Sequence, residues 1–156
     1  MKIAAALSLL LVLSAGCTTA STPAAPGNAA RVRALYDAFA RGDVATFMGT
    51  LDPEIVWLEA ENILYADRNP YRGPQAIGEG VFARLGADWD NFRVRTDKII
   101  DGGDTVVALG RYSATWKATG KQLDAQFAHV WTWRNGKVVR FEQYTDTAQF
   151  ARAQMR

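Results

Sequence analysis

Two ionisable side chains in apolar sequence contexts are the first candidates for chemistry. Glu59 ends the segment EIVWLE (54–59), and His129, the only histidine of the chain, lies in AHVWTW (128–133). A carboxyl group that loses water on burial has a raised pKa, which makes it a usable base near neutral pH. A nearby imidazole could donate to a developing enolate or pass on a proton. The pair therefore points to acid–base chemistry on a carbonyl-type molecule.

A hairpin predicted at Asn135-Gly136 would bring further polar groups to His129. If its turn has two residues, His129 lies opposite Glu142, and the carboxylate of Glu142 orients the imidazole. Asp146 falls on the same face, because side chains alternate across a sheet. Asp146 is a second acid candidate, and capping of a helix at 147–155 is its alternative role.

Aromatic residues on this face and on neighbouring segments complete an expected pocket. A mostly apolar lining with a few polar groups is typical of ligand sites. The expected ligand-binding residues are Trp57, Tyr65, Trp89, Tyr112, Phe127, Trp131, Glu142 and Tyr144. A second two-residue turn, at Thr119-Gly120, would place Gly110 opposite His129 and leave space for a ligand there.

Composition excludes several other kinds of site. The 156 residues include one cysteine, so neither an internal disulfide nor a multi-cysteine zinc site is possible. One histidine excludes a two-histidine metal site, and no nucleotide-binding motif is visible. A net charge of +2 does not suggest a nucleic-acid partner. We therefore expect chemistry without a metal or cofactor.

The first 28 residues are expected to be a targeting signal and a tether rather than part of the folded domain. Lys2 precedes an apolar run (3–13) that is too short for an ordinary transmembrane helix. LSAGC (13–17) resembles a bacterial lipobox, which implies a signal peptide over 1–16 and a lipid on Cys17. Residues 17–28 form a flexible tether in this interpretation. Thr18, which is not aspartate, implies the outer membrane facing the periplasm; an ordinary signal peptide cleaved near Ala20 is the alternative.

The remaining chain, 29–156, predicts helices followed by strands. Apolar spacing predicts helices over 29–41 and 44–51, with Asp43 as a cap, and a third over 74–85. Strands are expected at 54–60, 92–100, 105–116, 122–133 and 138–146, with a last helix at 147–155. This order predicts an α+β fold with helices on one face of a mostly antiparallel sheet.

Four segments resemble the SnoaL-like branch of the NTF2-like superfamily, to which the ketosteroid isomerases belong. They are LYDAFARGD (35–43), PYRGPQAI (70–77), TGKQLDAQFAHVWTW (119–133) and GKVVRFEQYTDT (136–147). The resemblance implies a curved sheet wrapped by helices into a cone with a deep pocket.

The same resemblance places Glu59 at the position of the isomerase base and His129 at that of its oxyanion-hole acid. Leu35 stands where the isomerases carry a donor tyrosine, and the adjacent Tyr36 should point about 100° away on a helix. Steroid isomerase chemistry is therefore not expected.

These observations predict a lipid-tethered SnoaL-like domain that holds a small hydrophobic molecule. The chemistry would be of the isomerase, cyclase or dehydratase type, with Glu59 as base and His129 as donor or proton shuttle. A binding lipoprotein without catalysis is the main alternative. The third is a structural module that forms a homodimer through its open sheet face. Glu59 as a solvated surface group and His129 as an inert core residue are the corresponding structural alternatives.

Overall fold

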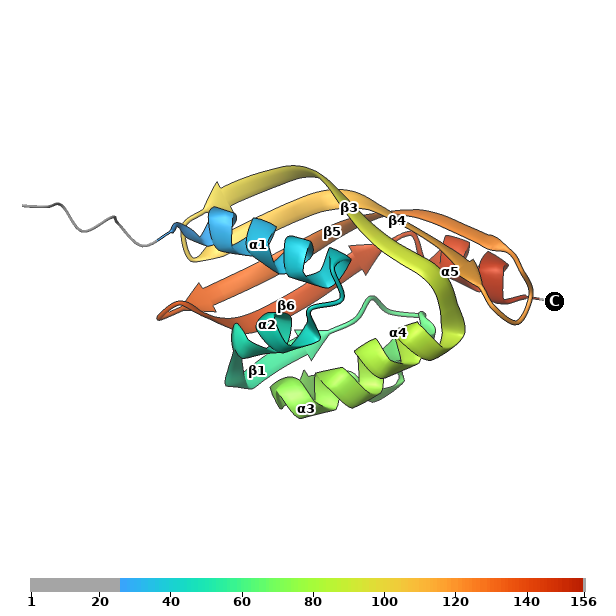
Figure 1. Cartoon of the computed structure of the whole chain (residues 1–156), viewed down its shortest axis with the longest axis horizontal. Coiled ribbons are helices and arrows are strands. Elements are labelled where there is room, and N and C mark those ends of the chain that lie inside the picture. Colours follow the sequence, from blue (N-terminus) through green and yellow to red (C-terminus); the bar gives the residue numbers. More distant parts are fainter. Residues whose placement is uncertain (1–25, 156) are drawn as a thin grey trace, which may run out of the picture.

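The computed structural model describes residues 26–155, so the expected signal peptide and Cys17 lie outside the described part. One six-stranded sheet, in the order β2-β1-β6-β5-β4-β3, forms the frame of the fold. Its long strands curve around α1 (Asn28–Ala40), as Figure 1 shows. Neighbouring strands are antiparallel except β1 and β6, which are parallel. The α+β cone expected from the sequence is confirmed. Within the described residues, every helix is too short or too polar to cross a membrane.

The first two helices follow the predicted apolar stripes. Helix α1 starts at Asn28, one residue before the expected start of the domain, and buries Val32, Leu35 and Tyr36. Helix α2 (Val44–Gly49) begins at the predicted cap, where the Asp43 carboxylate accepts from the Thr46 amide at 3.0 Å. Leu51, expected in this helix, instead begins β1 (Leu51–Leu58).

The segment after β1 contains more regular structure than the sequence predicts, since no helix or strand is expected between residues 60 and 74. It contains a short 3₁₀ helix, η1 (Leu64–Arg68), and a two-residue strand, β2 (Tyr71–Arg72). Helical structure then continues through α3 (Gly73–Ile77), a π-helical turn, η2 (Gly78–Phe82), and α4 (Ala83–Asp88). Gly80 allows this helix to approach β2, since a Cβ there would meet Cδ1 of Tyr71 at 2.9 Å.

Four long strands and a final helix complete the chain. They are β3 (Trp89–Gly102), β4 (Thr105–Trp116), β5 (Gln122–Arg134), β6 (Lys137–Thr145) and α5 (Thr147–Gln154). The predicted turn between β5 and β6 is present. Asn135 and Gly136 have φ values of 50° and 75°, the left-handed pair that a tight hairpin requires.

A β-bulge overturns the register predicted for the rest of that hairpin. Trp133 pairs with Val138 as predicted, but Thr132 pairs with Arg140, so Val139 has no partner. His129 therefore lies opposite Gln143, and the prediction that Glu142 faces it is wrong. The physical reason is burial: the shift places Phe141 in the core, 1% exposed, while the charged Arg140 and Glu142 turn outward.

The hairpin between β4 and β5 is also offset from its predicted register, by two residues. Ala108 lies opposite His129, and Gly110 lies opposite Phe127. A two-residue offset keeps the same side chains on the inner face, so Tyr112 and His129 still share it. The predicted space at Gly110 is filled, because the Phe127 ring lies where a Cβ of residue 110 would be.

Candidate active site

A mostly apolar cavity of about 50 Å³ lies between the inner face of the sheet and the helices. This exceeds the roughly 10–15 Å³ that one water needs, and is smaller than the roughly 150 Å³ cavity known to hold benzene. Its lining comprises Tyr36, Phe39, Phe47, Trp57, Glu59, Ile63, Tyr65, Val81, Phe82, Leu85, Phe92, Val94, Tyr112, His129, Trp131, Phe141, Gln143 and Phe150. Glu59 and His129, the two principal residues of the sequence hypothesis, thus share one cavity.

Glu59 follows the last residue of β1 and is 5% exposed. Its Oε1 accepts a 2.6 Å hydrogen bond from Nε1 of Trp57. Its backbone is held on both sides by Asn69, whose side chain donates to the Glu59 carbonyl and accepts from the Glu59 amide. Burial raises the pKa of Glu59 to about 7, against the opposing effect of hydrogen bonds from Trp57 and Gln143. The carboxyl group can therefore both accept and release a proton near neutral pH.

His129 lies between two tyrosine hydroxyls. Its Nδ1 is 2.7 Å from Oη of Tyr36, and its Nε2 is hydrogen-bonded to Oη of Tyr112. Phe127 stacks on the imidazole with a centroid separation of 4.0 Å. Burial lowers the pKa of His129 to about 3, so the imidazole is neutral at physiological pH.

Tyr36 is a site residue that the sequence hypothesis excluded. It is 7% exposed, it lines the cavity, and its hydroxyl accepts from Nε1 of Trp131 at 3.1 Å. The prediction that Tyr36 points away from the site is wrong, because α1 buries a stripe wide enough to include both Leu35 and Tyr36. The apolar stripe of α1 predicts that Tyr36 is buried, but not that its hydroxyl reaches His129.

Gln143, rather than Glu142, lies opposite His129, and Phe141, rather than Tyr144, contributes an aromatic ring of β6 to the cavity. Gln143 lines the cavity, and its Nε2 donates to Oη of Tyr112 at 2.8 Å. Glu142 instead pairs with Arg140 at 2.9 Å, and Tyr144 is 58% exposed. Glu142 therefore does not orient His129, and neither residue contributes to this cavity.

Asp146 takes the helix-capping role rather than a place in the cavity. It precedes α5, and its Oδ1 accepts from the backbone amide of Gln149 at 3.4 Å. Of the two roles open for Asp146 from sequence, the structure places it at the cap.

The remaining predicted aromatics divide between the lining and its support. Trp57, Tyr65, Tyr112 and Trp131 line the cavity. Phe127 lies behind the imidazole of His129 rather than on the cavity surface. Trp89 is 3% exposed and lies outside the cavity lining, although its Nε1 donates to Oη of Tyr65 at 2.9 Å.

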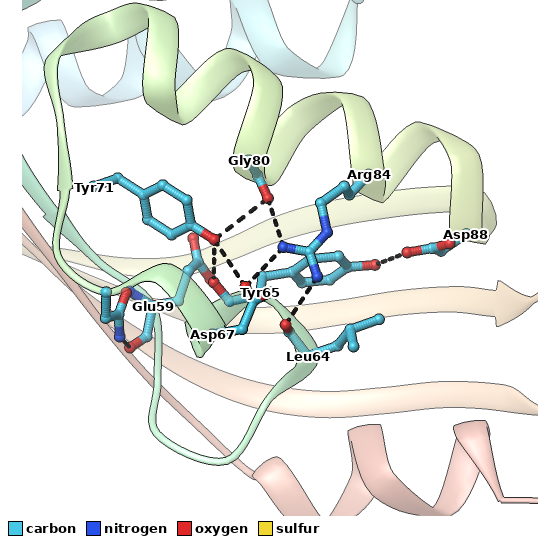
Figure 2. Close-up of polar contacts among 9 residues, drawn as sticks. Glu59, Leu64, Tyr65, Asp67, Tyr71, Gly80, Arg84 and Asp88 are labelled. Carbon is cyan, nitrogen blue, oxygen red and sulfur yellow. Dashed lines mark hydrogen bonds and ion pairs between the residues drawn. The ribbon is translucent and has the colours of Figure 1, made fainter.

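A network centred on Arg84 fixes the wall that carries Tyr65 (Figure 2). From α4, the Arg84 guanidinium donates to Asp67 at 2.8 Å and to the Leu64 carbonyl at 3.1 Å. The hydroxyl of Tyr71 donates to the Tyr65 carbonyl at 2.6 Å. The Arg84 bonds attach η1 to α4, and the Tyr71 bond attaches it to β2, so the wall is held by polar contacts as well as by packing.

Two surface grooves adjoin the cavity. The first, the apolar groove, has a volume of about 260 Å³ and shares Phe39, Phe47, Phe82, Leu85 and Phe92 with the cavity. The second, the polar groove, has a volume of about 940 Å³ and shares Glu59 and Gln143 with it. Aromatic rings thus separate the cavity from one groove, and the Glu59–Gln143 pair separates it from the other.

Comparison with known proteins supports the observed architecture. The model of the SnoaL-like domain family matches residues 32–141. An NTF2-like protein from Burkholderia thailandensis is 39% identical, covering 85% of this chain and all of that one, with a TM-score of 0.81. No curated protein matches the sequence significantly.

Two further solved structures share the fold. The structure of TerC co-crystallised with polyporic acid is 27% identical, covers 81% of this chain and 96% of that one, and has a TM-score of 0.73. A protein from Catenulispora acidiphila with a ketosteroid isomerase-like fold, in complex with trimethylamine, is 18% identical. It covers 72% of this chain and 82% of that one, with a TM-score of 0.62, and shows the fold alone.

Proposed function

Because the chain belongs to the SnoaL-like family of the NTF2-like superfamily, we propose that it binds a small, mostly apolar carbonyl compound and moves a proton on it. The observation that carries this proposal is the shared cavity. Glu59 and the two tyrosines bonded to His129 line the same cavity. The reaction class is a cofactor-free isomerisation, cyclisation or dehydration.

Glu59 would serve as the proton acceptor. A base works best when its pKa is close to the working pH, and burial brings the pKa of Glu59 to about 7. Its hydrogen bond from Trp57 and the contacts of Asn69 to its backbone hold the carboxyl group in place. A carbon acid beside it would lose a proton to Oε1 or Oε2, which leaves an enolate on the ligand.

The tyrosine hydroxyls, rather than His129 itself, would face the enolate oxygen. Both ring nitrogens of His129 are already bonded to Tyr36 and Tyr112, so the imidazole has no free nitrogen for a ligand. A hydroxyl donor in a site of low polarity stabilises developing negative charge on oxygen. The donor role that the sequence assigned to His129 therefore passes to its two partners.

The cavity and the apolar groove limit the ligand in size and shape. At about 50 Å³ the cavity alone is too small for a six-membered ring. A ligand such as cyclohexanone would therefore place its carbonyl end in the cavity, and its apolar remainder would extend past Phe39 and Phe82 into the apolar groove. The relative co-crystallised with polyporic acid supports a small organic molecule as the ligand.

Deuterium exchange tests this function without knowledge of the natural substrate. Cyclohexanone in D₂O would exchange its α-hydrogens faster with the protein than without it, as followed by proton NMR. Glu59→Gln should abolish the acceleration, whereas Glu61→Gln, on an exposed neighbour, should preserve it. Binding without any acceleration would support the second candidate, a non-enzymatic binding protein, which the mostly aromatic lining also favours.

Attachment to the bacterial envelope is a separate part of the proposal and rests on the sequence LSAGC (13–17). Two or three acyl chains on Cys17 would hold the protein at the outer membrane durably. Cells given an alkyne-labelled fatty acid should label the protein, and Cys17→Ser should remove the label and release the domain from the membrane fraction. Label that persists in Cys17→Ser contradicts the lipid anchor.

A homodimer through the outer sheet face is the remaining partner proposal. Tyr144 is 58% exposed on that face. Tyr144→Glu should convert a dimer to a monomer in analytical ultracentrifugation. A wild-type protein that sediments as a monomer at all concentrations rejects the dimer.

A further inference from the structure

The contacts around His129 allow its hydrogen-bond protons to be counted. The imidazole touches one tyrosine hydroxyl at each ring nitrogen, Tyr36 at Nδ1 and Tyr112 at Nε2. All three side chains are buried, at 7% exposure or less. Each hydroxyl has one proton to donate and two lone pairs to accept with.

Both tyrosine oxygens already accept a bond whose direction is fixed. Trp131 can only donate, so Tyr36 accepts from its Nε1 at 3.1 Å. The amide of Gln143 is oriented by the backbone, because its Oε1 accepts from the Ala60 amide at 3.1 Å. Its Nε2 therefore donates to Oη of Tyr112 at 2.8 Å. Neither tyrosine can satisfy these neighbours by donating its own proton.

The ring can use only one of the two hydroxyl protons. A neutral imidazole has one nitrogen that accepts and one that donates. If Nδ1 accepts from Tyr36, then Nε2–H donates to Tyr112, and the Tyr112 proton is unused. In the other tautomer Nε2 accepts from Tyr112, Nδ1–H donates to Tyr36, and the Tyr36 proton is unused. Among residues 26–155 neither hydroxyl has another acceptor within hydrogen-bonding distance.

We propose that His129 is a positioning residue whose tautomer selects which tyrosine, Tyr36 or Tyr112, donates to the ligand. The site offers one tyrosyl proton at a time, so its ligand presents one acceptor oxygen on an otherwise apolar body. This inference rests on the proposed function in one respect, that the ligand occupies the cavity beside these hydroxyls. A simple ketone or enone has this pattern. Burial, which lowers the pKa of His129 to about 3, keeps the ring in the neutral form that the count requires.

The consequence for specificity is a preference for oxygen over carbon at one point of the ligand. A hydrocarbon of the same shape leaves the buried hydroxyl proton without an acceptor. Such an unpaired donor weakens binding by about 10- to 100-fold. Cyclohexanone should therefore bind more tightly than methylenecyclohexane, which replaces the carbonyl oxygen with a CH₂ group.

The tautomer can be measured directly, because the chain has one histidine. In protein labelled with ¹⁵N-histidine at pH 7, the two ring nitrogens give separate signals that report which one carries the proton. Tyr36→Phe should move the proton to Nε2, from which it is donated to Tyr112. The Tyr112 proton can then reach water or a ligand in the cavity, whereas a proton on Nδ1 would have no acceptor once the hydroxyl of Tyr36 is removed. Tyr112→Phe should move it to Nδ1 for the same reason. Tyr144→Phe, on the exposed outer face, should leave the wild-type ratio unchanged.

The outcomes separate the proton count from the proposed function. Opposite tautomers in the two inner variants, with a ketone-dependent change of the ratio in the wild type, support both. Opposite tautomers with no binding of either ring compound support the count and reject the proposed ligand class. A ring protonated at both nitrogens at pH 7, or the same tautomer in both variants, overturns the count even if cyclohexanone binds.

Discussion

The indole Nε1–H of Trp57 donates a 2.6 Å hydrogen bond to Oε1 of Glu59, two residues further along the same face of the chain. This bond stabilises the ionised carboxylate and so opposes the effect of burial on its pKa. Burial, this bond and a weaker contribution from Gln143 together bring the pKa of Glu59 to about 7. Trp57 is thus part of the lining and also adjusts the protonation of Glu59.

Replacing Trp57 should raise the pKa of Glu59. Trp57→Phe keeps an aromatic ring but removes the donor, and we expect an increase of about one pKa unit. Carbon-13 NMR of the labelled carboxyl group, followed against pH, measures the change. Trp116→Phe, outside the cavity lining, is the matched control and should leave the titration unchanged. A lower pKa in Trp57→Phe would show that the indole does not stabilise the carboxylate.

Glu59→Gln should make the free energy of unfolding rise with pH between about 4.5 and 6.5. His129 has a folded pKa of about 3, below its ordinary value of 6.5, so the unfolded chain binds more protons in this window. Stability from the neutral ring is therefore present above pH 6.5 and is lost as the pH falls. With Glu59 removed, this effect is unopposed and amounts to about 2–3 kcal/mol over the window. Urea unfolding at a series of pH values measures the slope, and a flat profile would contradict the assignment.

His129→Gln should reverse that slope. Glu59 has a folded pKa of about 7, above its ordinary value of 4.5, so the folded state holds the extra proton. Stability from this group is complete below pH 4.5 and is lost as the pH rises toward 7. Without the opposing imidazole, the free energy of unfolding should fall by about 2–3 kcal/mol from pH 4.5 to 6.5. The double variant, Glu59→Gln with His129→Gln, should show neither slope. This result would attribute the two slopes to Glu59 and His129 rather than to the surface carboxylates.

Asp146→Ala should lower stability without affecting ligand binding. Its carboxylate caps α5 through Gln149, and loss of such a cap costs about 1 kcal/mol. Asp146→Ser can restore the cap without an acid and should recover the stability, as read from urea unfolding. If both variants no longer accelerate the deuterium exchange of cyclohexanone, Asp146 has a chemical role that its position at the cap does not explain.

The local sequence pattern predicted most helices, strands and turns, because these depend on interactions between residues that are close in the sequence. The cap at Asp43 and the turn at Asn135-Gly136 depend only on adjacent residues, and both formed as predicted. Which side chains of β4 and β5 point to the inner face could be predicted from the alternation of side chains along a strand. The two-residue offset in register leaves this assignment unchanged. Glu59 and His129 were located by the same alternation together with the family resemblance.

The missed site residues depended on contacts between distant segments. The bulge at Val139 exists because Phe141 can stack on Trp57 of β1, with a centroid separation of 3.7 Å. Nothing within the hairpin itself encodes that partner. Tyr36 enters the site because the curved sheet surrounds α1, a tertiary feature that helical spacing alone cannot specify.

Removing the guanidinium of Arg84 should loosen the wall that carries Tyr65. Arg84 joins α4 to Asp67 and to the Leu64 carbonyl, so Arg84→Ala leaves η1 without these bonds (Figure 2). The ion pair is partly exposed, and we expect a loss of only about 1 kcal/mol in overall stability. Amide hydrogen exchange over 64–69 should accelerate far more than exchange in β4 or β5. Arg68→Ala, an exposed arginine of the same segment, is the control and should leave this exchange unchanged. Equal acceleration throughout the sheet would show instead that Arg84 supports the whole fold rather than this wall.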